Sequence, residues 1–388
     1  MWCGGRRVAT TLLALGLVTT GCGTAPEPGE PGPALGMEPA AAAPPSSVEP
    51  QPERFTLVAS GDVLIHTPLI AQSVAEGRAR GGRDFRPLFS GVQPVVSEAD
   101  LAICHLEVPL GDADGPFRGY PVFNAPPEVA EALAATGYDA CTTASNHTLD
   151  QGEQGVATTL EALDAAGIRH TGSARTKQEA EQPLLLEVNG ARVGLVSFTY
   201  GFNGFQRPQG KEWMANLLDV EEVLAQARAA RRAGADVVVV ALHWGAEYQH
   251  APTEEQQALA RQLLPDPDID LIIGHHAHVV QPFERIGDEW VAYGLGNHVA
   301  VQALANGRTE EGVIARFTFA RDGDRWRVEQ AEYLPTLIKL GSPVRVVDLT
   351  APDGGGIDPE RRARALERID EVVLSRGAAE AGLTRPGR

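Results

Sequence analysis

Most histidines of this chain follow short apolar runs of the length that forms β-strands. Eight of the ten histidines do so, and carboxylate and amide side chains stand close to them in the sequence. Because the carboxyl ends of parallel strands meet at one edge of a sheet, we expect these polar side chains to lie together there. The residues concerned are Asp62, His66, His105, Glu107, Asn146, His147, Asp150, His243, His275, His276, His278, Asn297 and His298.

Imidazole nitrogens and carboxylate oxygens form a ligand set that suits zinc, manganese or iron. The pattern contains no group of cysteine ligands, which argues against a structural thiolate site. Two cations about 3.5 to 4 Å apart can bind opposite oxygens of a phosphoryl group and lower the pKa of a bridging water. The pattern therefore predicts a catalytic centre with two divalent metal ions, a bridging carboxylate and one proton donor that binds no metal.

Several of these residues also have an ordinary structural interpretation. Gly61 and Asp62 form a common turn pair, Asn146 could cap a helix, and the glycines near His275 and His298 could form tight turns. Three histidines fit a surface or packing role as well as a metal role: His66, His105 and His298. The strongest candidates for metal ligands are His243, His276 and His278. They follow the ends of aliphatic strands, where few structural reasons explain a histidine.

The elements that must position these residues alternate between strands and helices. Apolar runs predict strands at 55–59, 101–104, 140–143, 193–198, 237–242, 271–273, 291–293 and 313–319. Several runs are continuous, which is typical of strands covered on both faces. Helices are predicted at 128–136, 154–166, 220–233 and 254–263, with a glycine after each of the first three and a capping box at Thr253 and Gln256. The pattern indicates a largely parallel α/β sheet, and the later strands up to Tyr333 are expected to form a second, partly antiparallel sheet.

The amino-terminal segment has the layout of an export signal. Arg6 and Arg7 precede an apolar run at 8–20, which is shorter than the roughly 20 residues of a spanning helix. Cys22 after Gly21 resembles a bacterial lipobox, so 1–21 are expected to be a lipoprotein signal peptide and Cys22 the lipidated residue. An ordinary cleaved signal and an uncleaved anchor are the alternatives. Residues 22–53 are rich in Pro and Ala and are expected to form a disordered tether.

Composition excludes two classes of protein, and the remaining segments complete the expected domain organisation. A hydrophobic content of 43% excludes a fully disordered protein, and a formal net charge of −18 disfavours binding to nucleic acid. The folded domain is expected at 54–345, followed at 346–388 by a helix at 361–374 and a tail outside the core. Cys104 and Cys141 could form a disulfide in an oxidising compartment, although two buried free thiols are slightly favoured.

Six ordered motifs between about Phe55 and Tyr333 resemble the CapA family of capsule or poly-γ-glutamate biosynthesis proteins. They are Gly-Asp at 61–62, His-Leu-Glu at 105–107, Ser-Asn-His-Thr-Leu-Asp at 145–150, His-Trp-Gly-Ala-Glu-Tyr at 243–248, Gly-His-His-Ala-His-Val-Val-Gln at 274–281 and Gly-Leu-Gly-Asn at 294–297. The resemblance implies a calcineurin-like metallophosphoesterase fold, which is a four-layer α/β/β/α sandwich with mixed sheets and a metal cluster at the sheet edge.

The resemblance also implies roles for individual residues. Asp62 and His278 would bind a first metal ion, and Glu107 would bridge to a second. The ligands of the second ion would be Asn146, His243 and His276. The catalytic residues would be His147, as the general acid, and Asp150. Three positions depart from the family pattern: His105 replaces asparagine, His298 replaces phenylalanine, and His66 is added. With His275 and Asn297, these three are possible additional ligands or neighbours of ligands.

The expected function is therefore a surface-anchored role in the synthesis, export or anchoring of a capsule or poly-γ-glutamate-type polymer, with a metal-dependent hydrolase or transferase centre. A general envelope metallophosphoesterase and a non-catalytic metal- or ligand-binding module are the alternatives. The expected partners are an anionic extracellular polymer or a phosphate ester, the membrane through the lipid anchor, and other capsule-synthesis proteins. An arginine group could contact an anionic polymer, or could be only a solvated helix face: Arg78, Arg80, Arg83 and Arg86.

Overall fold

The computed structural model describes residues 53–302 and 307–386. The expected signal peptide, the lipidation site at Cys22 and nearly all of the expected tether lie outside the described residues. Among the residues that are described, no helix combines the length and the apolar composition needed to cross a membrane.

The first sheet has nine strands and mixes parallel and antiparallel pairs. Its order is β14 (Arg345–Asp348), β13 (Arg325–Lys339), β12 (Glu311–Asp322), β1 (Arg54–Val63), β2 (Leu101–Leu106), β3 (Ala140–Thr142) and β4 (Arg169–Thr171), with β11 (Asn297–Val299) beside β1 and β15 (Leu383–Thr384) beside β13. Strands β1 to β4 are parallel, as is β11 to β1, whereas β12, β13 and β14 are joined by antiparallel pairing.

The second sheet has six strands. Its order is β5 (Leu184–Val188), β6 (Ala191–Thr199), β7 (Val237–His243), β8 (Leu271–His275), β10 (Glu289–Ala292) and β9 (Phe283–Ile286). The four central strands are parallel, and β5 and β9 add antiparallel edges. The prediction that the late strands form this sheet is wrong, because β12 pairs with β1 and β13 pairs with β12, so both belong to the first sheet.

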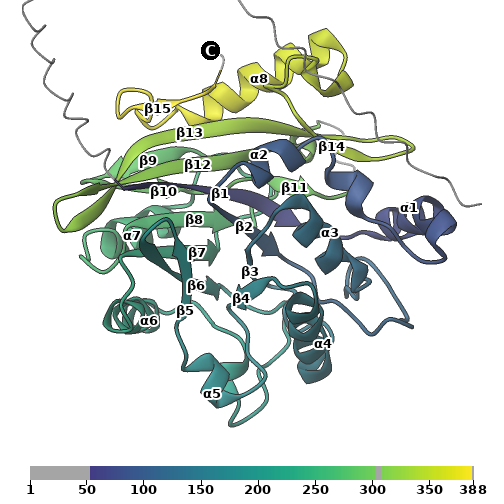
Figure 1. The fold of residues 1–388 in the computed structure, drawn as a ribbon, viewed down its shortest axis with the longest axis horizontal. Helices are drawn as coiled ribbons and strands as arrows, with labels where there is room; N and C mark the ends of the chain where they lie inside the picture. The colour runs from purple at the N-terminus through teal and green to yellow at the C-terminus, as the bar shows by residue number, and fades with distance from the viewer. Residues whose placement is uncertain (1–52, 303–306, 387–388) are drawn as a thin grey trace, which may run out of the picture. The chain divides into compact units, whose positions relative to one another are not determined.

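Helices cover the outer faces of the two sheets (Figure 1). The α-helices are α1 (Thr67–Gly77), α2 (Gln93–Ser97), α3 (Glu128–Thr136), α4 (Gly152–Ala165), α5 (Lys177–Ala180), α6 (Val220–Arg232), α7 (Glu254–Leu263) and α8 (Pro359–Val373). Short 3-10 helices lie at Arg78–Arg80, Arg86–Phe89, Glu212–Met214, Arg308–Glu310 and Gly354–Gly356. All five predicted helices are present, as α3, α4, α6, α7 and α8, and both hydrogen bonds of the capping box at Thr253 are formed.

Three apolar clusters fill the spaces between four layers. In β7, Val237 and Val239 face the first sheet, whereas Val238 and Val240 face α6 and α7. In β1, Leu57 faces the second sheet and Val58 faces the helices on the other side. Alternate residues of a strand point to opposite faces, so continuous apolar runs are what a sheet buried on both faces requires. The predicted α/β/β/α sandwich with mixed sheets is confirmed.

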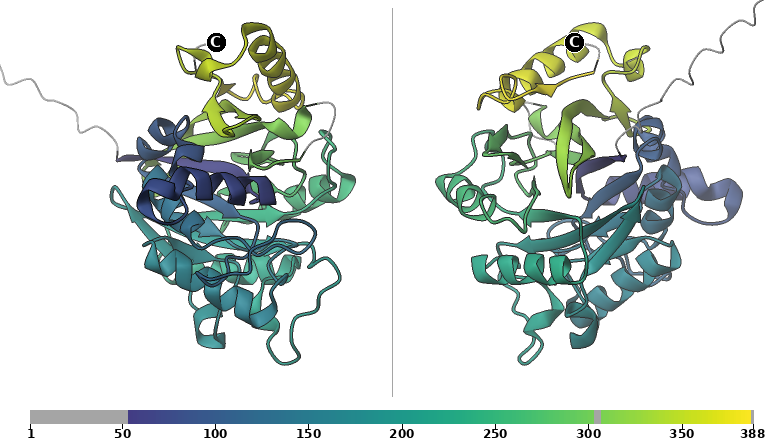
Figure 2. Two further views of the ribbon diagram at one scale, coloured as in Figure 1. Left: turned by 90° about the vertical axis from the view of Figure 1, so that its right-hand side faces the viewer. Right: turned by 60° about the vertical axis from the view of Figure 1, so that its left-hand side comes forward.

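The carboxyl-terminal segment belongs to this core. Ile369 and Val373 of α8 are buried in the cluster between the sheets, and Ala378 and Leu383 beyond the helix join them. Figure 2 shows the yellow helix α8 lying against the light green strands of the first sheet. The interpretation of the tail as lying outside the core is wrong, because β15 pairs with β13 and carries Leu383 inward.

Cys104 and Cys141 form a disulfide bond. They are register partners in the parallel strands β2 and β3, with Cα atoms 4.5 Å apart. The preference for two free thiols is therefore wrong: strand pairing places both side chains on the same face of the sheet, within bonding distance.

Replacing both cysteines with alanine is expected to lower the free energy of unfolding by about 2 to 4 kcal/mol. The bond joins residues 37 positions apart, so its loss gives the unfolded chain more conformational freedom. Urea unfolding of the oxidised wild type and of the Cys104→Ala/Cys141→Ala variant measures the difference. Reduced wild type should unfold close to the variant, and equal midpoints for oxidised and reduced wild type would contradict the prediction.

Candidate metal centre

Asp62 lies at the end of β1, where β1 runs between β2 and β11. The preceding Gly61 has no space for a side chain, because a Cβ atom there would lie 2.0 Å from the carbonyl oxygen of Gly296. The Asp62 N–H donates to the same oxygen at 3.0 Å. Gly61 is thus required by close packing of two strands, and this packing fixes where the Asp62 carboxylate points.

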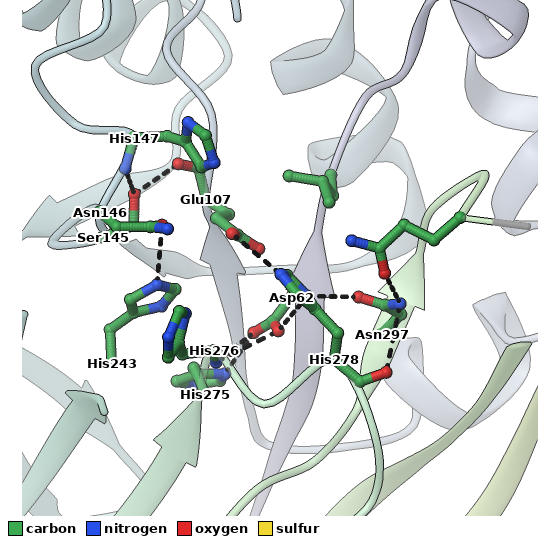
Figure 3. Close-up of polar contacts among 12 residues, drawn as sticks. Asp62, Glu107, Ser145, Asn146, His147, His243, His275, His276, His278 and Asn297 are labelled. Carbon is green, nitrogen blue, oxygen red and sulfur yellow. Dashed lines mark hydrogen bonds and ion pairs between the residues drawn. The ribbon is translucent and has the colours of Figure 1, made fainter. Parts of the chain in front are cut away.

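The buried Asp62 carboxylate is the hub of the cluster. Its oxygens lie 3.2 Å from Nδ1 of His275 and 3.2 Å from Nδ1 of His278, and the His276 N–H donates to it at 3.2 Å (Figure 3). Burial by itself would raise the pKa of Asp62, but the imidazoles of His275 and His278 outweigh it and hold this pKa well below its usual range. Asp62 is therefore a buried anion in a position to bind a cation.

A second chain of contacts links three strands through two imidazoles. Thr142 Oγ1 lies 2.8 Å from Nδ1 of His105, and Nε2 of His105 lies 2.9 Å from Nδ1 of His243. Nε2 of His243 in turn lies 3.0 Å from Oδ1 of Asn146. Burial and the neighbouring imidazoles lower the pKa of both His105 and His243 well below the usual value. Both rings are thus neutral near pH 7, which is the form that binds metal.

Glu107 is buried, with 1% of its surface exposed, and neither carboxylate oxygen has a hydrogen-bond partner. Its nearest ionic contact is Nε2 of His278, 3.7 Å from Oε1. Burial raises the pKa of Glu107 well above its usual range, and the Asp62 and Glu247 carboxylates add to this shift against an opposing effect of His278. A buried carboxylate without donors is unfavourable unless a cation faces it, so this side chain fits a metal ligand.

His276 and His278 differ in their electrostatic environment although they are two residues apart. Burial lowers the pKa of His276 to about 3. Burial also acts to lower the pKa of His278, but the carboxylates of Glu107 and Asp62 raise it to about 9. A protonated His278 therefore supplies a positive charge beside the Asp62 carboxylate, which is the charge a metal ion would supply in its place.

Potential ligand atoms approach within 4.8 Å of one another in three groups. The groups are Asp62 with His105 and His243, Asp62 with Glu107 and His278, and Glu247 with His276 and His278. Each group combines imidazole with carboxylate, as expected for zinc, manganese or iron. The described residues therefore offer a set of positions in which metal ions fit.

His147 has the surroundings of a proton donor. Its Nδ1 lies 2.8 Å from Oδ2 of Asp150, and the same oxygen accepts the Phe123 N–H at 2.7 Å. The backbone N–H of His147 donates to Oγ of Ser145 at 3.0 Å, and this hydroxyl donates to the main-chain oxygen of Glu107. Asp150 thus fixes the orientation of the His147 ring through Nδ1.

The sequence profile described as bacterial capsule synthesis protein PGA_cap matches residues 56–302, which is more than half of the chain. The chain belongs to this family. It is 28% identical over 301 residues to the capsule biosynthesis protein CapA of Bacillus anthracis, an alignment that covers 75% of this chain and 69% of the relative. It is 26% identical over 245 residues to the PGA biosynthesis protein CapA of Bacillus subtilis. This alignment covers 61% of this chain and 62% of the relative, so the chain spans less than two thirds of that relative's length. Among solved structures it is similar to the calcineurin-like phosphoesterase YfkN of Bacillus subtilis, with a TM-score of 0.41, 15% identity, and coverage of 83% of this chain and 98% of that one.

The three positions where this capsule-family member departs from the expected motifs have different surroundings. His105 lies inside the cluster, with its ring stacked on that of His275 at 4.1 Å. His298 lies on the other face of the sheet, where it stacks on Phe89 and its Nε2 lies 3.0 Å from the Tyr138 hydroxyl. His66 accepts the Val301 N–H at 3.2 Å. Neither His298 nor His66 belongs to any of the three groups found among the described residues.

Asn297 acts on the cluster through His278. Its Oδ1 lies 3.0 Å from His278 Nδ1, and its Nδ2 donates to the Thr309 carbonyl oxygen at 2.9 Å.

Two residues of the cluster were absent from the sequence-based candidates. Glu247 belongs to one of the three groups, and the half-exposed Tyr200 packs its ring 4.5 Å from that of His276. Both follow the ends of predicted strands, so the rule that found the histidines could also have found them.

Proposed function

We propose that this protein is a metal-dependent hydrolase or transferase that acts at the cell envelope in the synthesis, export or anchoring of a capsule or poly-γ-glutamate-type polymer. Membership of the capsule synthesis family and the printed names of the two CapA relatives support the polymer connection. The observation that carries the chemistry is the buried, unpartnered carboxylate of Glu107 beside Asp62 and His278.

In the proposed centre, Asp62 and His278 would hold a first divalent cation, Asn146, His243 and His276 would hold a second, and the Glu107 carboxylate would serve both. His105 lies close enough to Asp62 and His243 to add a nitrogen. When bound, zinc, manganese or iron ions would act as Lewis acids on a phosphoryl oxygen.

Proton donation and the orientation of the rings are assigned to the protein's own side chains. His147 donates a proton from Nε2 to the leaving oxygen of the ester. Asp150 holds the proton on Nδ1 through its 2.8 Å contact and stabilises the charged ring before that transfer. Tyr200 at the exposed edge packs against the His276 ring and restricts its orientation.

Export and lipid anchoring are part of the proposal. The motifs that favour them are the basic and apolar start of the chain and Cys22. The Cys104–Cys141 disulfide supports an oxidising compartment, because such bonds are rare in the reducing cytosol.

The arginine group at 78–86 contributes little positive charge for binding an anionic polymer. Arg80 and Arg86 both pair with Asp84, at 3.7 and 2.8 Å, and Arg83 pairs with Glu128 at 3.1 Å. Asp84 and Glu128 therefore balance two of the four positive charges of the group, and the formal net charge of −18 opposes binding of a polyanion. We infer that an anionic substrate is held mainly by bound cations.

Metal analysis combined with a substrate screen tests the proposal. The purified chain is stripped with a chelator and reconstituted separately with zinc, manganese and iron. About two equivalents of one metal and turnover of a phosphomonoester or phosphodiester are expected. Absence of any stoichiometric metal would refute a metal-dependent enzyme, and metal without turnover would indicate a binding module. Unchanged surface polymer in a deletion strain, with turnover intact, would indicate a general envelope phosphoesterase.

A further inference from the structure

A pocket of about 400 Å³ lies between α8, the segment that follows β7 and the short 3-10 helix before β12. A volume of this size is typical of a site for a small ligand or for one or two units of a longer chain. None of the side chains around it belongs to the metal centre. The lining includes His250, Pro252, Arg308, Arg368, Glu371 and Arg376.

Two segments lead from His278 of the metal centre to this pocket. On one side, the Tyr248 ring lies 6.0 Å from that of His278, and His250 follows two residues later, which is at most about 7 Å of chain. On the other side, Asn297 contacts His278 and donates from Nδ2 to the carbonyl oxygen of the residue after Arg308. The pocket is therefore within reach of a chain molecule whose reacting group lies at the metal centre.

The wall of the pocket carries more positive than negative charge. Three guanidinium groups line it, from Arg308, Arg368 and Arg376, against the single carboxylate of Glu371. Burial lowers the pKa of His250, and the charges of Arg308 and Arg368 lower it further, against the opposing effects of a backbone carbonyl oxygen and Glu371. A positive wall in a protein with a formal net charge of −18 favours an anion at this place.

Two of the guanidinium groups are held by partners outside the pocket. Nε and Nη2 of Arg368 donate to the Glu311 carboxylate, whose side chain is 2% exposed against 38% for Arg368. Nε of Arg376 donates to Glu284 at 2.8 Å, and its Nη2 donates to Gln257 at 2.9 Å. Among the described residues, Nη1 of neither arginine has a hydrogen-bond partner. Each guanidinium is thus fixed in place with donors that remain for an anionic oxygen.

We propose that Arg308, Arg368 and Arg376 form an anion subsite that binds a carboxylate of the substrate chain while another group of that chain lies at the metal centre. The inference rests on the proposed function, because a poly-γ-glutamate-type polymer carries a carboxylate on every unit. Guanidinium groups match the geometry of a carboxylate and keep their charge at any physiological pH. The anion subsite would hold the chain beside the bound cations and so set the direction in which the chain crosses the centre.

Binding of γ-linked triglutamate to the full chain reconstituted with metal tests the anion subsite by isothermal titration calorimetry. The Arg308→Gln variant should bind this peptide about 10-fold or more weakly than wild type, because a charged donor is lost. The Glu371→Gln variant should bind it about threefold more tightly, because a like charge is removed. Arg232→Gln, at an exposed arginine in the last turn of α6, is the matched control and should bind as wild type.

A second ligand separates carboxylate recognition from other contacts. The same tripeptide with its α-carboxyl groups amidated should bind wild type more weakly than triglutamate does, and with an affinity that Arg308→Gln does not change. Affinity for triglutamate should also fall as the salt concentration rises, because solvent-exposed charges are screened.

No binding of triglutamate by wild type, or the same affinity in wild type, Arg308→Gln and Glu371→Gln, would overturn the anion subsite. Weaker binding by both variants would also overturn it, because removal of a like charge cannot weaken binding of an anion to this wall. The proposed function is judged separately, by the metal content and ester turnover of wild type. A wild type that binds triglutamate through Arg308 but turns over no ester would retain the subsite and refute the enzyme.

Discussion

The Asp62→Asn variant is expected to lose most of its bound metal and to turn over phosphoester at least about 1,000-fold more slowly than wild type. Asp62 belongs to two of the three groups of potential ligands, so one substitution removes an anion from both. A metal ion contributes several kcal/mol of transition-state stabilisation, and each 1.4 kcal/mol corresponds to a tenfold change in rate. An amide keeps the shape of the side chain but not its charge, which isolates the electrostatic effect.

Metal content after dialysis and the turnover number of the same preparation measure this effect. Asp114→Asn is the matched control, because Asp114 is an exposed aspartate outside the three groups. That control should retain both metal and activity. Full metal content with wild-type turnover in Asp62→Asn would remove Asp62 from the proposed centre.

The His147→Ala variant is expected to reduce turnover by about 100-fold or more while its metal content stays at the wild-type level. The proposed role of His147 is proton donation, and its ring is held by Asp150 and not by a ligand group. A substrate with a strongly acidic leaving group needs no proton at the leaving oxygen, so the loss should be much smaller with such a substrate. Steady-state rates on a pair of esters that differ only in leaving-group acidity provide the measurement.

Two further variants separate proton donation from general damage to the site. Asp150→Asn should lower turnover less than His147→Ala, because the ring remains but its orientation and charge are less well supported. His170→Ala is the control histidine, paired with Asp164 and outside the three groups, and should behave as wild type. An equal loss with both leaving groups would argue that His147 positions the substrate and does not donate the proton.

Several features of this protein could be read from the sequence because they depend on neighbours in the chain. The helix at 128–136 ends at a glycine with φ 111°, and the Thr253 capping box forms as expected. The continuous apolar run that became β7 predicted a strand covered on both faces. The gathering of polar residues at the sheet edge was also predictable, because parallel strands place their carboxyl ends together.

The sequence did not predict which face of the sheet each of two adjacent residues in a strand would occupy. Asn297 and His298 were both candidates, yet β11 turns Asn297 toward His278 and His298 toward Phe89. The side chains of a strand alternate between faces, so the choice depends on which face of β11 meets the cluster. In β2 the same alternation points Cys104 to its disulfide partner and His105 to His243.

Local patterns and motifs were enough to predict the α/β class, most strands and helices, the family and the residue types of the cluster. Four outcomes could be seen only in the folded protein: β12 pairs with β1, Cys104 meets Cys141, Leu383 is buried, and Glu247 reaches His276 and His278. These outcomes join segments far apart in the chain, and their free energy comes from surfaces that exist only after the sheets and helices have packed together.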